Sequence, residues 1–271
     1  MKRILCSLLC LACLAMLPVC AQNKDAVIVY CNDGTDAAFL RHGIDSIVCS
    51  KDYQNIWALG QEERIPTRVV DSVKFVAFYA HLSCPDDQHP HAIDLGLPSG
   101  THWACCNVGA AAPSEFGGYY AWGETSEKED YSWDTYAHYS QQTGNYADLG
   151  SDICGTDLDP AHALWGGDWQ MPSQEQCAEL VAYCSSEWAK VGDVYGRFIM
   201  GRNGGCIFIP AAGCRWFGYR NNAYSHVCCW SGTAYSPYAG AAYGLGFYQG
   251  KQVWTDYDYR YFGQSIRAVA E

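Results

Sequence analysis

The sequence predicts an α+β protein, because strand-like segments open the chain, two helices follow, and further strands close it. The first segments are typical of short hairpins and end before residue 78. Helix-start signals occur at residues 159 and 173, and strand-like runs return after residue 197. Strands and helices do not alternate as a parallel sheet would require, so we expect antiparallel pairing.

Residues 1–21 predict an export signal. A short basic start precedes an apolar run, and Val19-Cys20-Ala21 supplies the small residues that a signal peptidase prefers, which places the mature start at Gln22. The run is too short and too close to the terminus to favour a transmembrane helix. A lipid on Cys20 is the alternative to free secretion, and we expect membrane attachment only in that case. The expected location is the bacterial cell surface, the periplasm or the medium.

Charge and cysteine content narrow the range of partners. Removal of a signal carrying Lys2 and Arg3 takes the net charge from −12 to −14. A protein this acidic repels phosphate backbones, so we expect no nucleic-acid partner. Twelve of the 16 cysteines remain after removal of the signal. Export permits disulfides, but the spacing of the cysteines does not reveal their pairing, and some fit equally well as small buried apolar residues.

Residues 22–80 predict a small β module with two hairpin-like repeats. The segment Ile44–Val48 recurs as Val70–Lys74, 26 positions later. Each copy follows a strand-like run, residues 26–31 and 54–59, and a polar turn. The turn Asn32-Asp33-Gly34 suits a hairpin because Asn and Gly tolerate positive φ. We interpret the module as a connection between the main domain and an anchor or partner.

Residues 81–91 predict a polar, proline-containing linker. Cys84, His89 and His91 lie in it, and Cys and His are the usual ligands of zinc. A His-Pro-His sequence in a linker is more often simply solvated. We therefore expect neither a metal nor a cofactor.

Residues 92–271 predict the main domain. We expect a strand and turn over 94–101, a strand over 103–109 and a second β segment over 119–123. Residues 125–158 are polar and aromatic with few apolar runs, which predicts long loops. Loops of that length in a compact domain tend to be functional or poorly ordered.

Two helices follow these loops. Asp159 is placed as an N-cap with Pro160 at the first helical position. Residues 173–176 form a capping box for the second helix. Cys177, Leu180, Val181 and Cys184 follow at i, i+3, i+4 and i+7, so we expect them on one buried face. Residues 197–200 and 206–209 then predict a hairpin around 203–205.

A series of motifs in residues 92–271 resembles the Fibrobacter-type major paralogous domain, a family of secreted proteins in gut and rumen bacteria. The series comprises Asp94-Leu95-Gly96-Leu97, Trp103-Ala104, Cys106-Asn107-Val108-Gly109, Tyr120-Ala121-Trp122-Gly123-Glu124, Ile153-Cys154-Gly155-Thr156, residues 165–173, residues 208–213, Trp230-Ser231 and residues 263–269.

The resemblance implies a C-type-lectin-like fold. Such a domain has two helices, a central antiparallel sheet in which the two ends of the domain pair, and long loops on one side. Because Trp165, Trp169, Trp230 and Arg267 lie in the motifs shared with the family, the resemblance assigns them to the scaffold. The family is similar to the variable proteins of diversity-generating retroelements, in which a C-terminal ligand surface is rewritten at adenine-bearing codons. Residues 219–261 are rich in the amino acids that such rewriting yields.

The C-terminal region therefore predicts a non-enzymatic binding surface for a protein or a glycan. Tyr and Trp provide large contact area for little lost rotamer entropy, and Ser, Gly and Asn adapt around them. We expect ligand contacts from aromatic and polar residues in this region. They are Trp216, Tyr219, Asn221, Asn222, Tyr224, His226, Tyr235, Tyr238, Tyr248, Trp254, Asp256, Tyr257, Asp258, Tyr259 and Tyr261.

Three alternatives are weaker. Calcium-dependent sugar binding would use the cluster Asp148, Asp152, Asp157 and Asp159, but the sugar-binding motifs of such lectins are absent, and a helix cap explains Asp159 better. A copper oxidase related to sulfatase-modifying factors shares the implied fold, but Cys214, Cys228 and Cys229 do not reproduce its cysteine motif, and no other catalytic motif occurs. A surface adhesin or fimbrial-type assembly subunit would use the small β module for docking.

Overall fold

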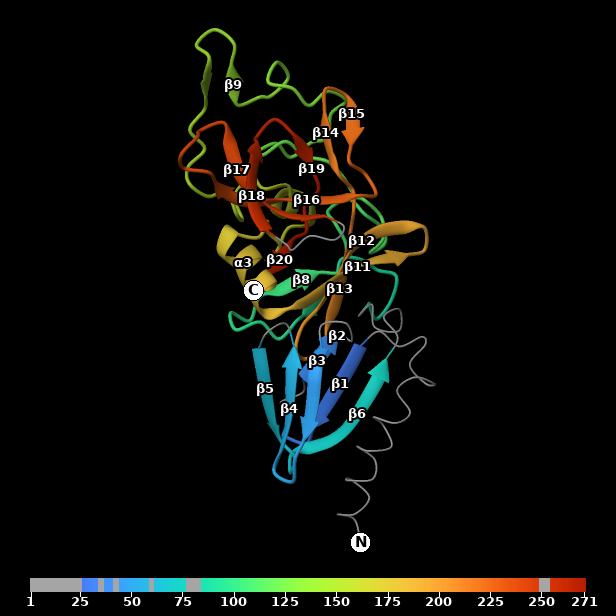
Figure 1. Ribbon diagram of the computed structural model, residues 1–271. Helices are drawn as coiled ribbons and strands as arrows, with labels where there is room; N and C mark the ends of the chain where they lie inside the picture. Colours follow the sequence, from blue (N-terminus) through green and yellow to red (C-terminus); the bar gives the residue numbers. More distant parts are fainter. Residues whose placement is uncertain (1–25, 34–36, 41–43, 59–60, 77–83, 249–253) are drawn as a thin grey trace. The chain divides into compact units, whose positions relative to one another are not determined.

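The computed structural model describes residues 26–33, 37–40, 44–58, 61–76, 84–248 and 254–271 (Figure 1). The chain falls into two compact units, one of residues Met1–His81 with Arg202–Gly204, the other of Leu82–Gly201 with Gly205–Glu271. The boundary lies after His81, so unit 2 includes residues 82–91, which the sequence predicts as part of a linker. The predicted export signal and Cys20 lie outside the described residues. None of the described helices has the length and apolar character needed to cross a bilayer.

Unit 1 is built from two repeats that exchange a strand. Its strands are β1 (Ala26–Cys31), β2 (Ala37–Leu40), β3 (Ile44–Cys49), β4 (Tyr53–Ala58), β5 (Gln61–Pro66) and β6 (Val70–Val76). The first two strands of each repeat form a hairpin, β1 with β2 and β4 with β5. The third strand of each repeat pairs with the first strand of the other, which gives the sheets β2-β1-β6 and β3-β4-β5.

The core of unit 1 draws on both repeats. Val29 and Cys31 come from the first repeat, and Ile56, Ile65 and Val69 come from the second. Because each sheet takes strands from both repeats, each half of the duplication completes the other. The recurrence that the sequence shows at 26 residues is therefore a repeat of structure as well.

Unit 2 holds the described helices and the remaining strands. They are β7 (Ala92–Asp94), β8 (His102–Ala104), β9 (Tyr139–Ser140), β10 (Asn145–Tyr146), α2 (Pro160–Trp165), α3 (Gln174–Tyr183), β11 (Ser185–Val191), β12 (Val194–Met200), β13 (Cys206–Pro210), β14 (Cys214–Trp216), β15 (Tyr219–Asn221), β16 (His226–Ala234), β17 (Ala241–Tyr248), β18 (Trp254–Tyr259), β19 (Gly263–Gln264) and β20 (Val269–Ala270). This unit consists mostly of strands and has two described helices, so it is broadly α+β. The order of strand and helix patterns in the sequence predicts this class.

The strands of unit 2 form several small antiparallel sheets instead of the single central sheet expected. Among the described residues these sheets are β20-β8-β7, β10-β9, β11-β12-β13, β15-β14-β19 and β16-β17-β18. The two ends of the unit do pair, with Val269 opposite Trp103. The hairpin expected around residues 203–205 is present as β12 and β13, with Met200 opposite Cys206. Strand β11 extends that sheet and was not predicted.

Two expected strands are shorter or absent. The strand expected over 103–109 ends at Ala104, because the chain turns so that the Asn107 side chain accepts a hydrogen bond from the buried Arg267 guanidinium at 2.9 Å. Residues 119–123 form no strand. Tyr120 makes a single bridge to Gln264, and hydrogen bonds to residues 260 and 264 keep this segment against the C-terminal run.

Both helices begin where their caps predict. The Asp159 carboxylate accepts from the Ala161 and His162 amides at α2, and Ser173 and Gln176 complete a reciprocal capping box at α3. Cys177 and Leu180 are buried as expected, and Cys184, just beyond the helix end, is buried with them. Val181 packs on the same cluster at its edge.

The core of unit 2 contains two of the four residues assigned to the scaffold, Arg267 and Trp230. Arg267 is fully buried and donates to the Asn107 side chain and to the carbonyl oxygens of Ala104 and Phe208. Trp230, also fully buried, donates its indole N–H to the Tyr120 carbonyl at 2.9 Å. These bonds join the start, middle and end of the unit into one frame. Trp165 and Trp169 pack edge to face at 5.3 Å beside this core.

Candidate functional site

The hairpin β14–β15 presents an aromatic residue at its tip. Its turn consists of Phe217 and Gly218, with φ of 46° and 75°. Positive φ values at both central residues are typical of a type I′ turn, whose twist matches that of the two strands it joins. Asn-Gly is the preferred residue pair in this turn. Phenylalanine is strained in this conformation, at a cost of about 1–2 kcal/mol. The turn nevertheless leaves the Phe217 ring exposed to solvent.

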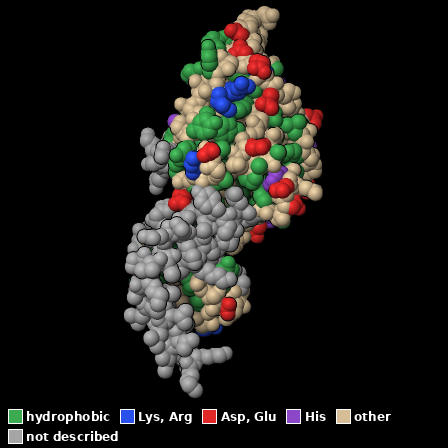
Figure 2. All heavy atoms as spheres, turned by 90° about the vertical axis from the view of Figure 1, so that its right-hand side faces the viewer, with side chains coloured by type: hydrophobic (Ala, Val, Ile, Leu, Met, Phe, Trp, Pro, Cys, Tyr) green, Lys and Arg blue, Asp and Glu red, His purple; other side chains and the backbone are tan. Residues whose placement is uncertain are grey.

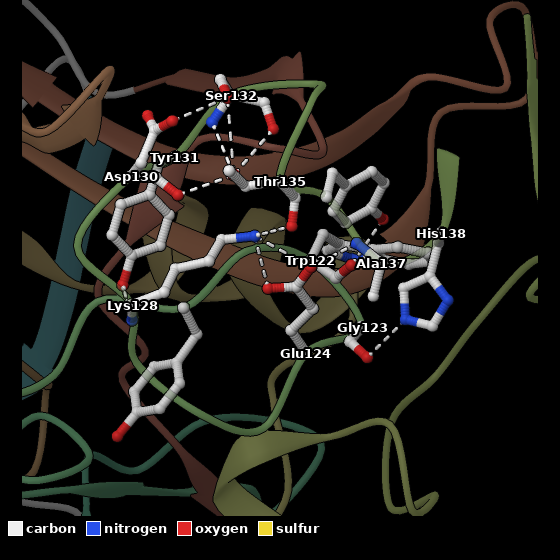
Figure 3. Close-up of polar contacts among 12 residues, drawn as sticks. Trp122, Gly123, Glu124, Lys128, Asp130, Tyr131, Ser132, Thr135, Ala137 and His138 are labelled. Atoms are coloured by element: carbon white, nitrogen blue, oxygen red, sulfur yellow. Dashed lines mark hydrogen bonds and ion pairs between the residues drawn. The ribbon is translucent and has the colours of Figure 1, made fainter. Parts of the chain in front are cut away.

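The loop from Glu124 to His138 carries a second exposed ring, that of Trp133. Figure 3 shows the network that fixes this loop. The Lys128 ammonium lies 2.7 Å from the Glu124 carboxylate and donates to the Thr135 carbonyl at 3.0 Å. The same carboxylate accepts from the Ala137 amide at 2.8 Å. Glu124 therefore holds the beginning and the end of the loop together.

A tight turn within this loop sets the position of Trp133. The Thr135 hydroxyl donates to the Asp130 carbonyl at 2.7 Å, and the Thr135 amide donates to the Ser132 carbonyl at 3.2 Å. The Phe217 amide donates to the Tyr131 carbonyl at 3.2 Å, which ties the hairpin tip to the loop. The two exposed rings thus come from segments joined by backbone hydrogen bonding.

Two buried tyrosines of the loop fasten it to the segment over residues 119–122. The Tyr136 hydroxyl donates to the Trp122 carbonyl at 2.6 Å, and the Tyr131 hydroxyl donates to the Tyr119 carbonyl. Burial raises the pKa of both phenols. Both hydroxyls therefore keep their protons and remain donors at neutral pH.

The exposed rings form one continuous aromatic row. We define the row as Trp216, Phe217, Trp133, Tyr259 and Tyr238, whose exposed fractions lie between 43% and 47%. Trp133 packs edge to face on Phe217 at 5.5 Å and on Tyr261 at 5.8 Å. Tyr261 in turn stacks on Tyr259 at 5.5 Å, and Tyr259 contacts Tyr238 at 6.1 Å.

The row has a buried aromatic base. Phe262 lies 5.2 Å from Trp216 and 4.9 Å from Tyr261 between ring centroids. Only 7–8% of Phe262 and Tyr261 is exposed. At the other end, Tyr146 of β10 contacts Tyr238 at 6.1 Å. In Figure 1 the hairpins β9–β10 and β14–β15 lie toward the same end of unit 2. Figure 2 shows hydrophobic side chains in patches among acidic and basic ones on one face.

The structure brings some of the predicted contact residues together in this row and places others elsewhere. Trp216, Tyr238 and Tyr259 belong to the row. Tyr261 requires a correction, because it is buried beneath the row and supports Trp133 and Tyr259 instead of facing solvent. Tyr219, next to the hairpin turn, is 72% exposed. The backbone of Trp254 and Asp256 lies in β18, but their side chains are outside the described residues.

The other predicted residues form smaller groups. Tyr257 stacks on Tyr235 at 3.9 Å. His226 meets Tyr248 edge to face at 4.0 Å, and Tyr224 contacts Phe116 at 5.4 Å. Asn221 ends β15, and Asn222 follows it with φ of 58°. The Asp258 carboxylate accepts a hydrogen bond from the Gln264 side-chain amide at 2.9 Å, which places it partly in the scaffold.

Sequence reasoning missed two members of the row, Trp133 and Phe217. The aromatic loops over 125–158 were expected to be either functional or poorly ordered, and no aromatic residue in them was named as a ligand contact. Phe217 next to Gly218 was a usable signal, because a bulky residue in a two-residue turn is unusual.

A separate hollow in unit 2 is lined mostly by polar residues. It has a volume of about 440 Å³ and contains none of the rings of the row. Its lining residues are Ser99, Gly100, Thr101, Asp152, Cys154, Gln170, Ser173, Gln176 and Glu271. Burial, together with the neighbouring Asp152, raises the pKa of the Cys154 thiol. That thiol stays protonated and is a poor nucleophile.

Three of the four aspartates considered for calcium accept hydrogen bonds from backbone amides. Asp148 accepts from the Gly150 amide at 3.0 Å, and Asp152 accepts from the Cys154 amide at 2.7 Å. Asp159 is buried and accepts from four amides, those of Gly155, Ala161, His162 and Met171. These carboxylates stabilise turns and a helix start.

Searches against protein-family models, curated proteins and solved structures find no match to this chain.

Proposed function

We propose that this chain is an exported binding protein without enzymatic activity, which recognises a protein or glycan through the aromatic row of unit 2. The supporting observation is the continuity of the row. Five exposed rings from four separate segments contact one another directly or through Tyr261 and Phe262. Exposed contiguous apolar surface of this kind is typical of a recognition site.

The energetics of the row favour recognition over packing. Its rings are anchored from below, so little conformational freedom is lost when a ligand covers them. In binding surfaces a few such anchors carry most of the free energy, often ~2 kcal/mol or more each. The strain at Phe217 supports the same conclusion, since strained residues that persist tend to lie at functional positions.

The finer fold assignment also belongs to this proposal. We infer that residues 92–271 adopt a C-type-lectin-like fold similar to the Fibrobacter-type domain, with the motif residues as scaffold. The antiparallel pairing of β8 and β20 and the buried Trp230 and Arg267 support it. The similarity to retroelement variable proteins further predicts that the codons for residues 216–269 have a near-copy in the neighbouring DNA.

Substitution of the row tests the proposal. The mature protein is screened against an array of immobilised glycans and a library of displayed proteins, and every ligand found is measured again with variants. The double variant Trp133→Ala with Tyr259→Ala should weaken binding at least 100-fold, since each ring contributes about 1.4 kcal/mol or more. Its free energy of unfolding should fall by no more than about 1–2 kcal/mol, as for surface substitutions.

The matched control is Tyr183→Ala with Tyr195→Ala, two tyrosines of similar exposure outside the row. This variant should bind as the unchanged protein does. Equal affinity of the row variant and the control would refute the proposal. So would a steady-state turnover of any bound ligand.

A second function, that of an assembly subunit or adhesin, is favoured by one observation in unit 1. On the sheet β3-β4-β5, Trp57 and Val48 lie on the same face and remain 40% and 54% exposed. An apolar face of this kind suits docking to another subunit. Washed cells and outer-membrane fractions should then retain the protein, and Trp57→Ser should release it. Retention that is unchanged in Trp57→Ser would contradict this alternative.

A further inference from the structure

The segment that opens unit 2 folds back onto the turn after β8 and brings four metal-ligating side chains together. They are Cys84, His89, His91 and Cys105, and their ligand atoms all lie within 4.8 Å of one another. The first three were expected to be solvated in a linker. The fourth, 14 residues beyond His91, completes the set and was not recognised from the sequence.

The distances within the cluster match the edges of a tetrahedron around zinc. With Zn–S of about 2.3 Å and Zn–N of about 2.0–2.1 Å, tetrahedral coordination places a nitrogen and a sulfur about 3.5 Å apart. The Cys105 sulfur lies 3.2 Å from His89 Nδ1 and 3.6 Å from His91 Nδ1. The Cys84 sulfur lies within 4.8 Å of the Cys105 sulfur and of a ring nitrogen of each histidine.

Neighbouring groups orient these ligands. The His91 Nε2 lies 3.0 Å from the Asp86 carboxylate, so the carboxylate accepts the proton on Nε2 and leaves the Nδ1 lone pair for a metal. The same carboxylate oxygen accepts the Gln88 amide at 2.7 Å, which fixes the loop. The Cys105 sulfur accepts the His91 backbone amide at 3.1 Å. A carboxylate–histidine pair of this kind is the usual second layer of a zinc site.

The surroundings favour a structural ion over a catalytic one. Cys105 is only 3% exposed and belongs to the core of unit 2, and Cys84 packs against that core. Four protein ligands would close the coordination sphere, as in structural zinc sites, whereas catalytic sites leave one position open. Two sulfurs and two imidazoles at tetrahedral spacing suit zinc better than a hard cation such as calcium.

We propose that Cys84, His89, His91 and Cys105 bind one zinc ion, which fastens the first residues of unit 2 to the turn after β8. The site is independent of the aromatic row and of the proposed ligand-binding function. Its competitor is a disulfide between Cys84 and Cys105, which an oxidising compartment permits.

The mature protein, purified without chelators, tests the proposal by its metal content and thiol state. Mass spectrometry of metals should find one zinc per chain, and thiol mapping should find Cys84 and Cys105 unoxidised. Replacement of zinc by Co²⁺ should give the visible bands of tetrahedral cobalt and a sulfur-to-cobalt charge-transfer band. Removal of the metal should lower the Tm.

Variants locate the ion. Cys84→Ser and His89→Asn should lose stoichiometric zinc, whereas Asp86→Asn should keep one zinc per chain with an affinity about 10–100-fold weaker. The controls are Cys154→Ser and His102→Asn, partly buried residues of unit 2 outside the cluster, and both should keep the metal. If the ligand variants do not fold, the cobalt spectrum of the unchanged protein decides.

Three results would overturn the assignment. The first is a purified protein that contains no zinc and takes up no Co²⁺. The second is full zinc content in Cys84→Ser. The third is a disulfide that joins Cys84 to Cys105 in the protein as isolated.

Discussion

At the scale of single residues, Phe217 combines a stability cost with a functional position. Its positive φ is unfavourable for any side chain with a Cβ, and its ring contacts Trp133 at the surface. Asparagine next to Gly218 would suit the same turn better. Phe217 therefore makes the turn less stable than asparagine would, but it adds an exposed ring to the row.

Phe217→Asn should separate the two effects. Relief of the backbone strain, about 1–2 kcal/mol, is comparable to or larger than the mean loss of the ring contact between Phe217 and Trp133, about 0.5–1.5 kcal/mol. The free energy of unfolding should stay the same or rise by up to about 1 kcal/mol, while affinity for the ligand falls about tenfold. Denaturant titration and binding measurements on one sample check both. A loss of more than about 1 kcal/mol in stability would mean that packing alone retains the phenyl ring.

His226 gives a pH dependence of known sign. Burial lowers the pKa of its imidazole below the ordinary value of 6.5. As the pH falls below 6.5, the unfolded chain binds a proton that the folded chain resists, so this residue makes the protein less stable on the acid side. His226→Asn should remove that contribution and narrow the difference in Tm between about pH 8 and about pH 5. An unchanged difference would show that other groups set the acid stability.

The sequence predicted that the C-terminal region exposes aromatic rings, but it did not predict which individual rings are buried. The aromatic composition of residues 216–261 predicted a surface rich in rings, and Trp216, Tyr238 and Tyr259 are exposed there. Tyr261 was not separable from Tyr259, because both follow the same alternation until the chain turns after β18. Its burial depends on Phe262 and Trp133, contacts that come from tertiary structure and leave no local pattern.

At the scale of elements, the loop over residues 124–138 is ordered by one partly buried ion pair. The Glu124 and Lys128 side chains are 12% and 20% exposed, so water screens their attraction less than at an open surface. Their hydrogen bonds reach both ends of the loop. The position of Trp133 should therefore depend on the Glu124 carboxylate, which contacts Lys128 and the Ala137 amide.

Glu124→Ala should loosen this loop and weaken binding together. Loss of a hydrogen-bonded charge should lower the free energy of unfolding by about 1–3 kcal/mol, and hydrogen exchange should accelerate over residues 124–138. The matched control is Lys190→Ala, which removes an ion pair to Asp193 with side chains 42% and 102% exposed. That change should cost less than about 1 kcal/mol. Fast exchange in the control, or none in Glu124→Ala, would contradict the role assigned to the network.

Elements differ in how well their sequence signals predicted them. The helix starts at Asp159 and Ser173 followed from side chains that bond to neighbouring amides, a local rule. The sequence predicted the pairing of the strands less well than the helix starts. Exchange of β3 and β6 between repeats requires contacts between distant segments, and β11 has every residue half-buried, without the alternation that identifies a strand.

At the scale of the whole molecule, the two units have separate cores. The core of unit 1 uses residues between 29 and 70, whereas the clusters of unit 2 use residues between 84 and 269. The row, its supporting loop and the proposed zinc site all belong to unit 2. Ligand capture and assembly, the two functions proposed, are thus assigned to different parts of the chain.

A chain that begins at Leu82 should therefore fold and bind alone. It retains the buried frame of Trp103, Trp230 and Arg267, so it should unfold cooperatively and bind ligand within about twofold of the mature protein, a difference under about 0.5 kcal/mol. Calorimetry and the binding assay check both, with Trp133→Ala in the shortened chain as the control that should still weaken binding. The same shortened chain should no longer sediment with outer membranes if unit 1 serves as the docking module. Binding more than tenfold weaker in a folded shortened chain would place part of the recognition surface in unit 1, because the row itself is complete without it.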